Sequence, residues 1–139
     1  MSAAQNHLVF HASLLLLWGL LLGAPYAKAI KRGAPAQTVH SWRVAHLSLP
    51  LGAVLMFSVA ALLPIFPVNE FWLWVLAGAL IASAYGFAVS TPLAAISGQR
   101  GLDSSESGWG RFVYAGNMLG VAGSLVAGLA LVIVSAKSL

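Results

Sequence analysis

Apolar and charged positions divide the chain into four long stretches that carry no charge. These stretches cover residues 1–27, 44–69, 71–99 and 112–136. Each contains the run of about 20 apolar residues that a helix needs to cross roughly 30 Å of hydrocarbon. The pattern predicts transmembrane helices at residues 8–29, 44–66, 71–92 and 112–135.

The same pattern excludes a β-barrel, because a membrane strand needs alternating apolar and polar residues. The run LLLLWGLLLG of residues 14–23 has no such alternation, and backbone groups in lipid must then be paired within a helix. Pro64 and Pro67 are expected to end the second helix. Tryptophans near segment ends are expected at the membrane interface (Trp42, Trp72, Trp74 and Trp109). The predicted fold class is an all-α integral membrane protein, a single four-helix transmembrane domain over residues 1–139, expected to be oligomeric.

Composition removes the soluble alternatives. The chain is 60% hydrophobic and only 7% charged, against roughly 25% charged residues in soluble domains. The net charge of +4 comes from seven Lys and Arg against three acids, so it reflects scarce acids, and no nucleic-acid partner is expected. The absence of cysteine excludes disulfides, thiolate-held metals and cysteine nucleophiles.

The basic residues predict an orientation. Six of the seven fall in the first and third connections or close beside them, and one lies near the C-terminus (Lys28, Lys31, Arg32, Arg43, Arg100 and Arg111, against Lys137). Positively charged loops stay in the cytoplasm. We therefore expect four spans in a bacterial inner membrane, with loops one and three cytoplasmic and both termini outside.

The first span also has a competing interpretation as a cleaved signal peptide. The sequence Ala27-Lys28-Ala29 resembles a signal-peptidase site. No Lys or Arg precedes the apolar run, however, and the run is long for a signal sequence. An uncleaved helix is the prediction.

Small residues at spacing four predict close helix packing in three of the segments. The expected ridges are Gly19, Gly23 and Ala27; Gly78, Ala82, Gly86 and Ser90; and Gly116, Gly120, Ser124 and Gly128. Packing within one bundle is the primary interpretation, and an interface between subunits is the alternative.

Polar side chains at membrane depth mark candidate functional positions, because they are expensive to bury in lipid. The candidates are His11, His46, Tyr85 and Asn117. His7 and His11 have the spacing of two ligands of one metal, but His7 is expected at the wet interface. Asn117 is expected to hold helices together rather than to touch substrate.

His46 is the sharpest candidate, because a neutral imidazole can bind haem iron through one nitrogen. The acids Glu70, Asp103 and Glu106 all fall in the predicted connections. This favours a single axial haem ligand over a carboxylate-rich metal site. A structural histidine that bonds a neighbouring helix is the alternative, and Tyr85 is likewise either a hydrogen-bond donor to substrate or a packing residue.

Short motifs in the first three segments resemble a family of small membrane isomerases, and the resemblance spans nearly all four segments. The run FHASLLLLWGLLLG of residues 10–23 and AHL of residues 45–47 resemble the first two helices of hydroxylaminobenzene mutases. The stretch from WRVAH to AALLP, residues 42–64, resembles styrene oxide isomerase. The stretch from VLAG, at residue 75, to Tyr85 is similar to that enzyme's third helix.

The resemblance implies a haem b isomerase in which His46 is the axial iron ligand and Tyr85 lies near the substrate. It also implies a trimer with haem near the subunit interfaces. The chain departs from both relatives at Gly52, where they carry an asparagine. It departs from the epoxide isomerase also at Ala77, where that enzyme has an acid, and at Ile81, where it has an asparagine. Asn117 is the candidate to replace the missing amide.

The expected function is therefore the rearrangement of a small aromatic substrate, with haem iron as Lewis acid. The substrate would be an aryl epoxide giving an aldehyde, or an arylhydroxylamine giving an aminophenol. His11 is expected beside the substrate or behind its ligands. One alternative is a haem-binding electron-transfer or anchor subunit, which would pair His46 with His11; a cofactor-free transporter or scaffold is another.

Overall fold

The computed structural model describes residues 1–104, 108–137 and 139, so Glu106 lies outside the described residues. The elements in chain order are α1 (Ala3–Leu21), α2 (Gly23–Lys31), α3 (Ala36–Leu62), the short 3₁₀ helix η1 (Leu63–Ile65), α4 (Glu70–Ser97) and α5 (Trp109–Ala136). In this part of the chain, four helical spans are long and apolar enough to cross a membrane (Ala3–Lys31, Ala36–Ile65, Glu70–Ser97 and Trp109–Ala136). The four-helix transmembrane fold is confirmed.

The spans are longer than the ranges expected from hydrophobicity. They contain 28 to 30 residues, which at about 1.5 Å per residue gives roughly 42–45 Å, the thickness of a bilayer with its headgroups. The extra turns are polar, as in residues 36–43. The predicted ranges are shorter because hydropathy marks only the part of a helix that lies in hydrocarbon. Glu70 is accordingly the first residue of α4 rather than part of a connection.

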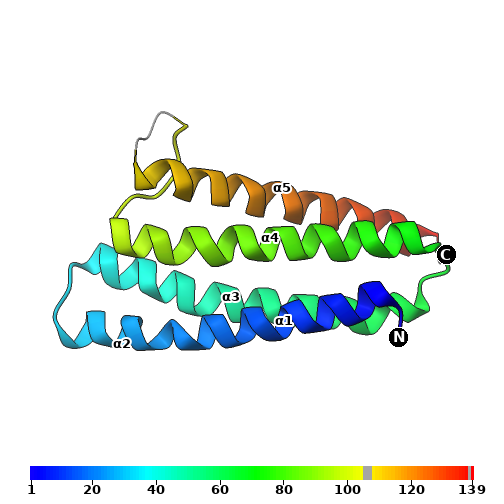
Figure 1. The fold of residues 1–139 in the computed structure, drawn as a ribbon, viewed down its shortest axis with the longest axis horizontal. Helices are drawn as coiled ribbons and strands as arrows, with labels where there is room; N and C mark the ends of the chain where they lie inside the picture. The colour runs from blue at the N-terminus through cyan, green and yellow to red at the C-terminus, as the bar shows by residue number, and fades with distance from the viewer. Residues whose placement is uncertain (105–107, 138) are drawn as a thin grey trace.

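The helices run up and down in two neighbouring pairs. Figure 1 shows α1 and α2 alongside α3, and α4 alongside α5, with both termini at one end of the bundle. Helices α1, α3 and α4 pack against one another, whereas α5 packs chiefly against α4. The first and third connections therefore lie together at the end opposite the termini.

Local sequence signals set the helix ends and one break. The Ser2 hydroxyl accepts a hydrogen bond from the Gln5 backbone N–H at the start of α1, and Asn69 does the same for Trp72 at the start of α4. The first span breaks at Leu22, between α1 and α2. Pro25 explains the break, because its ring lacks an N–H and collides with the carbonyl four residues earlier.

Gly19 brings α1 into direct contact with a proline inside α3. A Cβ on Gly19 would lie only 2.4 Å from Cδ of Pro50 and 3.0 Å from Cβ of Leu49. Only a residue without a side chain fits this contact. The close approach fixes how α3 lies against α1, and it places the residues one turn before Pro50 beside the α1 backbone.

Small residues also join α4 to α5, but not all those expected to do so. A Cβ on Gly86 would lie 2.6 Å from the backbone nitrogen of Gly120 and 2.7 Å from the backbone oxygen of Gly116. The hydroxyl of Ser83 donates to the Gly120 carbonyl at 2.7 Å. By contrast, added Cβ atoms on Gly78 and Gly128 would meet nothing within 4 Å, so the prediction that these two glycines pack within the bundle is wrong, and only the alternative of a subunit interface is left for them.

The first testable prediction concerns this helix contact. Gly86→Ala is expected to lower the melting temperature of the detergent-purified protein, because overpacking typically costs about 1–3 kcal/mol and backbone atoms cannot move aside as a side chain can. Gly78→Ala is the matched control on the same helix. It is expected to leave the melting temperature unchanged or slightly raised, since alanine is the better helix former. Equal melting temperatures for the two variants would contradict the α4–α5 packing.

Candidate functional site

His46 lies on α3 with its ring against the first span. Its Nδ1 is 2.9 Å from the backbone oxygen of Gly19. The ring also covers Gly23, whose added Cβ would come within 3.0 Å of the His46 Cε1. On the same side, the ring of Tyr26 stacks against it with centroids 6.0 Å apart. The α1–α3 contact and two glycines thus hold the imidazole in a defined, partly buried position.

The hydrogen bond of His46 determines its tautomer. A backbone carbonyl only accepts, so Nδ1 carries the proton and donates it to Gly19. The lone pair then resides on Nε2, which is the nitrogen that a haem-ligating histidine offers to iron. Within the described residues, no three His, Cys, Asp or Glu side chains gather as a metal site. The donor set therefore fits a single axial ligand better than a metal centre built from protein groups alone.

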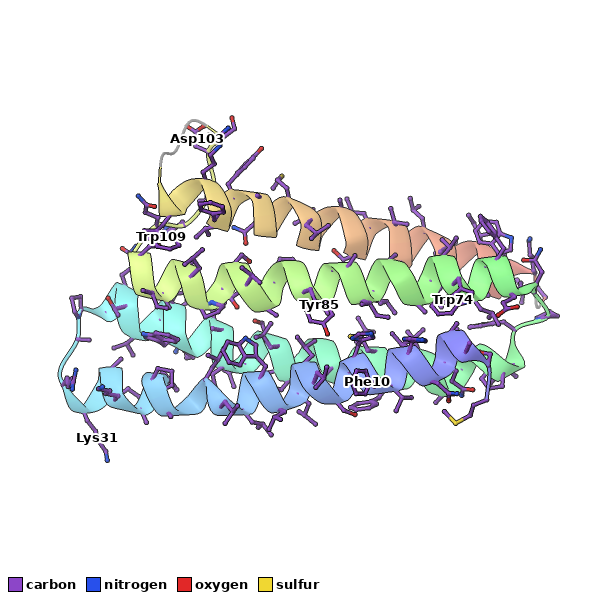
Figure 2. All side chains as sticks on the ribbon, in the orientation of Figure 1. Phe10, Lys31, Trp74, Tyr85, Asp103 and Trp109 are labelled. Atoms are coloured by element: carbon purple, nitrogen blue, oxygen red, sulfur yellow. The ribbon has the colours of Figure 1, made fainter. Side chains whose placement is uncertain are left out.

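Tyr85 and His11 form a second polar pair, between α4 and α1. The Tyr85 hydroxyl and His11 Nδ1 are hydrogen-bonded at 2.7 Å, and the two rings meet edge to face with centroids 5.5 Å apart. Figure 2 shows Tyr85 directed from α4 toward α1. The Tyr85 side chain remains 42% exposed, so this pair is open to the outside of the bundle.

Three further aromatic side chains lie along the contact between α1 and α4, on either side of this polar pair. His7 stacks on His11 with ring centroids 6.0 Å apart, and Trp74 packs on His7 at 5.4 Å. In the other direction, the Trp18 indole donates to the Ala88 carbonyl at 3.0 Å. His7 and His11 do share a helix face, as their spacing predicts. The contact of His7 with Trp74 was not foreseen, because sequence spacing does not show which residues of another helix lie opposite.

The structure brings Tyr85 to His11 but not to His46. His46 contacts the first span at Gly19, eight residues after His11, which is about 12 Å along a helix. The His46–Gly19 contact lies on the side of α1 that faces α3, whereas the Tyr85–His11 pair lies on the side that faces α4. The alternative that pairs His46 with His11 as two ligands of one haem is therefore not supported by the positions of these side chains in one chain.

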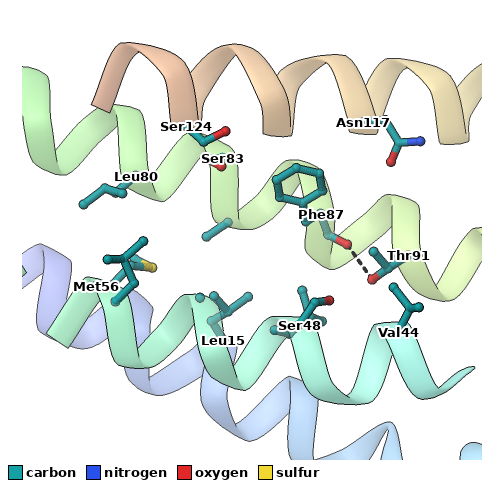
Figure 3. A pocket seen from close by; sticks show the side chains of 14 residues that line it. Leu15, Val44, Ser48, Met56, Leu80, Ser83, Phe87, Thr91, Asn117 and Ser124 are labelled. Carbon is teal, nitrogen blue, oxygen red and sulfur yellow. Dashed lines mark hydrogen bonds between the residues drawn. The ribbon is translucent and has the colours of Figure 1, made fainter. Parts of the chain in front are cut away.

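Asn117 has a structural role in this chain. Its amide nitrogen donates to the backbone oxygens of Arg100 and Gly101 at 3.1 and 3.3 Å. These bonds attach the third connection to α5. Asn117 also lines a cavity, and Figure 3 shows its amide oxygen on the side of that cavity. Asn117 is part of neither the His46–Gly19 contact nor the Tyr85–His11 pair.

The cavity, of about 470 Å³, lies between α3, α4 and α5 (Figure 3). Gly52 forms part of its wall, and a Cβ there would make ordinary contact with Leu15 at 3.5 Å. Neither His46 nor Tyr85 is among the lining residues, which are Leu15, Val44, Ser48, Leu49, Gly52, Leu55, Met56, Leu80, Ser83, Ala84, Phe87, Thr91, Asn117 and Ser124. Gly52 has no side chain and so adds no polar group to this wall.

Comparison with known proteins identifies a family for this chain. The family model described as styrene oxide isomerase matches residues 4–136, which is nearly the whole chain and includes all four spans. A search of curated proteins gives no match. An isomerase in the membrane is what this family implies. On the extent of the family match, the chain belongs to the styrene oxide isomerase family.

Proposed function

We propose that the protein rearranges a small aryl epoxide to the corresponding aldehyde in the membrane, with haem held by His46. The observation that carries the proposal is the His46–Gly19 hydrogen bond, which leaves Nε2 as the free ligand nitrogen. The family match supports the reaction class. When bound, ferric haem would supply a Lewis acid for an oxygen atom in an apolar site.

The reaction is balanced without a nucleotide or a second substrate. The C–O bond next to the ring breaks, a hydrogen moves with its electron pair from the neighbouring carbon to the ring-bearing carbon, and the oxygen remains as the aldehyde. The protein has only to bind, orient and exclude water. Four charge-poor spans offer a dry environment in which a polar contact to the oxygen is worth more than in water.

His11 determines what Tyr85 can do in this reaction. A phenol has one proton, and a neutral imidazole has one as well. If His11 Nδ1 carries its proton and donates to the Tyr85 oxygen across 2.7 Å, the Tyr85 proton is free for the substrate oxygen. We assign this tautomer to the active protein, with Tyr85 as the catalytic hydrogen-bond donor and His11 as the residue that positions it.

The separation of the His46–Gly19 contact from the Tyr85–His11 pair supports a proposal that two copies of the chain complete the site. His46 and Tyr85 use different grooves of α1, and Tyr85 is 42% exposed on the bundle surface. We propose that His46 of one copy faces Tyr85 of a neighbour, in a homo-oligomer, with a trimer as the expected state. An apolar aromatic substrate would then enter sideways from the lipid.

The test is a spectrum followed by turnover. Protein purified in detergent is expected to show a haem Soret band with a position open to added ligand, and to convert styrene oxide to the aldehyde. A low-spin bis-histidine spectrum without turnover would favour an electron-transfer subunit instead. Turnover of phenylhydroxylamine but not of the epoxide would move the function to the mutase reaction. Protein without haem or turnover would overturn the proposal.

A further inference from the structure

A second cavity continues the 470 Å³ cavity toward the end of the bundle that carries the first and third connections. It has a volume of about 340 Å³. The two cavities share Val44, Thr91 and Asn117 in their walls. Together they form one groove, called here the α3–α5 groove, which runs from a helix end into the membrane-spanning part of the bundle.

The inner part of this groove is apolar in its chemistry despite several hydroxyl groups. Thr91 donates to the carbonyl of Phe87 at 2.8 Å. Ser83 and Ser124 both donate to the carbonyl of Gly120, at 2.7 and 2.9 Å. Because their protons are donated to backbone carbonyls, within a helix or from α4 to α5, these hydroxyls offer few donors to a ligand. The inner groove suits a hydrocarbon chain.

The outer part of the groove carries donors and positive charge. Arg100 lines it, and so does His40. Arg43 donates to His40 Nδ1 at 2.9 Å; a guanidinium only donates, so His40 keeps its proton on Nε2. Among the residues that the structure describes, no acidic side chain lines either cavity. This end of the groove therefore favours an anionic group.

Ser90 gives a second, independent indication of a ligand. Its side chain is fully buried and lines the outer cavity, yet its hydroxyl has no hydrogen-bond partner within the described part of the chain. Buried polar atoms almost always have a partner. The Ser90 oxygen itself is closed off from solvent, so a ligand in the outer cavity would supply this partner on rotation of the side chain.

From these observations we propose that the α3–α5 groove binds an anionic phospholipid of the surrounding bilayer. The phosphate lies at Arg100 and His40, and one acyl chain lies in the inner cavity beside Gly52 and Leu55. Basic pockets between transmembrane helices on the cytoplasmic side commonly bind anionic headgroups, and the charges of the chain predict that this end is cytoplasmic. The lipid site lies apart from His46 and Tyr85 and is independent of the reaction proposed above.

The experiment measures lipid retention by the full chain. The purified protein is incubated with an equimolar mixture of phosphatidylglycerol and phosphatidylcholine of the same acyl composition, and the bound lipid is counted by native mass spectrometry. We expect phosphatidylglycerol to be retained at least about fivefold over phosphatidylcholine, since each cationic group adds about that factor. Arg100→Gln is expected to remove most of the preference.

Two further variants separate the headgroup from the chain. Ser48→Leu fills the inner cavity at a residue with an exposed side chain, and is expected to lower retention of both lipids. Lys137→Gln removes a charge at the opposite end of the bundle and is expected to change nothing. All variants are first shown to elute as wild type in size exclusion.

Several outcomes would overturn the lipid site. One is equal retention of the two lipids by the wild-type protein. Another is an unchanged preference for phosphatidylglycerol in Arg100→Gln. A third is a loss of that preference in Lys137→Gln as large as the loss in Arg100→Gln. Lipid bound to the monomer but absent from the oligomer would assign the groove to a second copy. Displacement of phosphatidylglycerol by equimolar oleate would assign it to a free fatty acid. None of these results bears on turnover of styrene oxide.

Discussion

His46→Ala is expected to abolish the Soret band of the purified protein and to lower kcat/KM for styrene oxide by at least about 10³-fold. Loss of the only proximal ligand removes the Lewis acid, whose stabilisation of developing charge is worth several kcal/mol, and each 1.36 kcal/mol is about tenfold in rate. The measurements are the absorbance spectrum and the initial rate of aldehyde formation.

Rescue of the His46→Ala variant by added imidazole tests whether the loss comes from the missing ligand itself. The Gly19 carbonyl that accepts from His46 Nδ1 remains in the variant, so the small molecule can occupy the vacated space, and part of the Soret band and of the rate is expected to return. His40→Ala is the control, because it removes a histidine of the same helix that bonds Arg43 instead. Unchanged haem coordination in His46→Ala would refute the ligand assignment.

Tyr85→Phe is expected to lower kcat/KM by about 10²-fold while leaving the Soret band in place. The change removes one hydroxyl and keeps the ring, so the lost quantity is a hydrogen bond to the substrate oxygen, for which 10²–10³ is the usual loss. Tyr114→Phe, on α5, is the matched control and is expected to keep full activity. A Tyr85→Phe variant with wild-type kinetics would reduce the tyrosine to a packing residue.

Variants of His11 distinguish positioning from packing. His11→Phe removes the partner of the Tyr85 hydroxyl and is expected to cost about tenfold in kcat with the Soret band unchanged, because Tyr85 loses its fixed direction. His11→Asn keeps an N–H donor and is expected to recover part of that loss. Combined with Tyr85→Phe, His11→Phe is expected to add nothing further, since both act through one hydroxyl.

Helix packing illustrates what small-residue patterns can and cannot reveal. Gly86, Gly116 and Gly120 were expected at a helix contact and do lie in one. Gly78 and Gly128 follow the same spacing, yet both face open space. Spacing four drifts around a helix of 3.6 residues per turn, so a long ridge leaves the contact face. Gly123, outside the expected ridge, packs against Ser83 for the same reason.

The sequence by itself determined the class of the protein, the number of spans and the candidate residues. These follow from local properties: a charge-free apolar stretch must be helical in lipid, and a histidine within it is conspicuous wherever it lies. Even the chemistry of His46 as a ligand needs only the nature of an imidazole. The family match over residues 4–136 agrees with this part.

Only the tertiary structure decided which of these residues meet. It pairs Tyr85 with His11 and His46 with the Gly19 carbonyl, and it uses the amide of Asn117 to hold a connection. Each contact joins residues on different helices, and depends on the rotation of those helices about their axes. Hydrophobic side chains surround all four spans, so no polar face in the sequence specifies that rotation; close contacts such as Pro50 on Gly19 do.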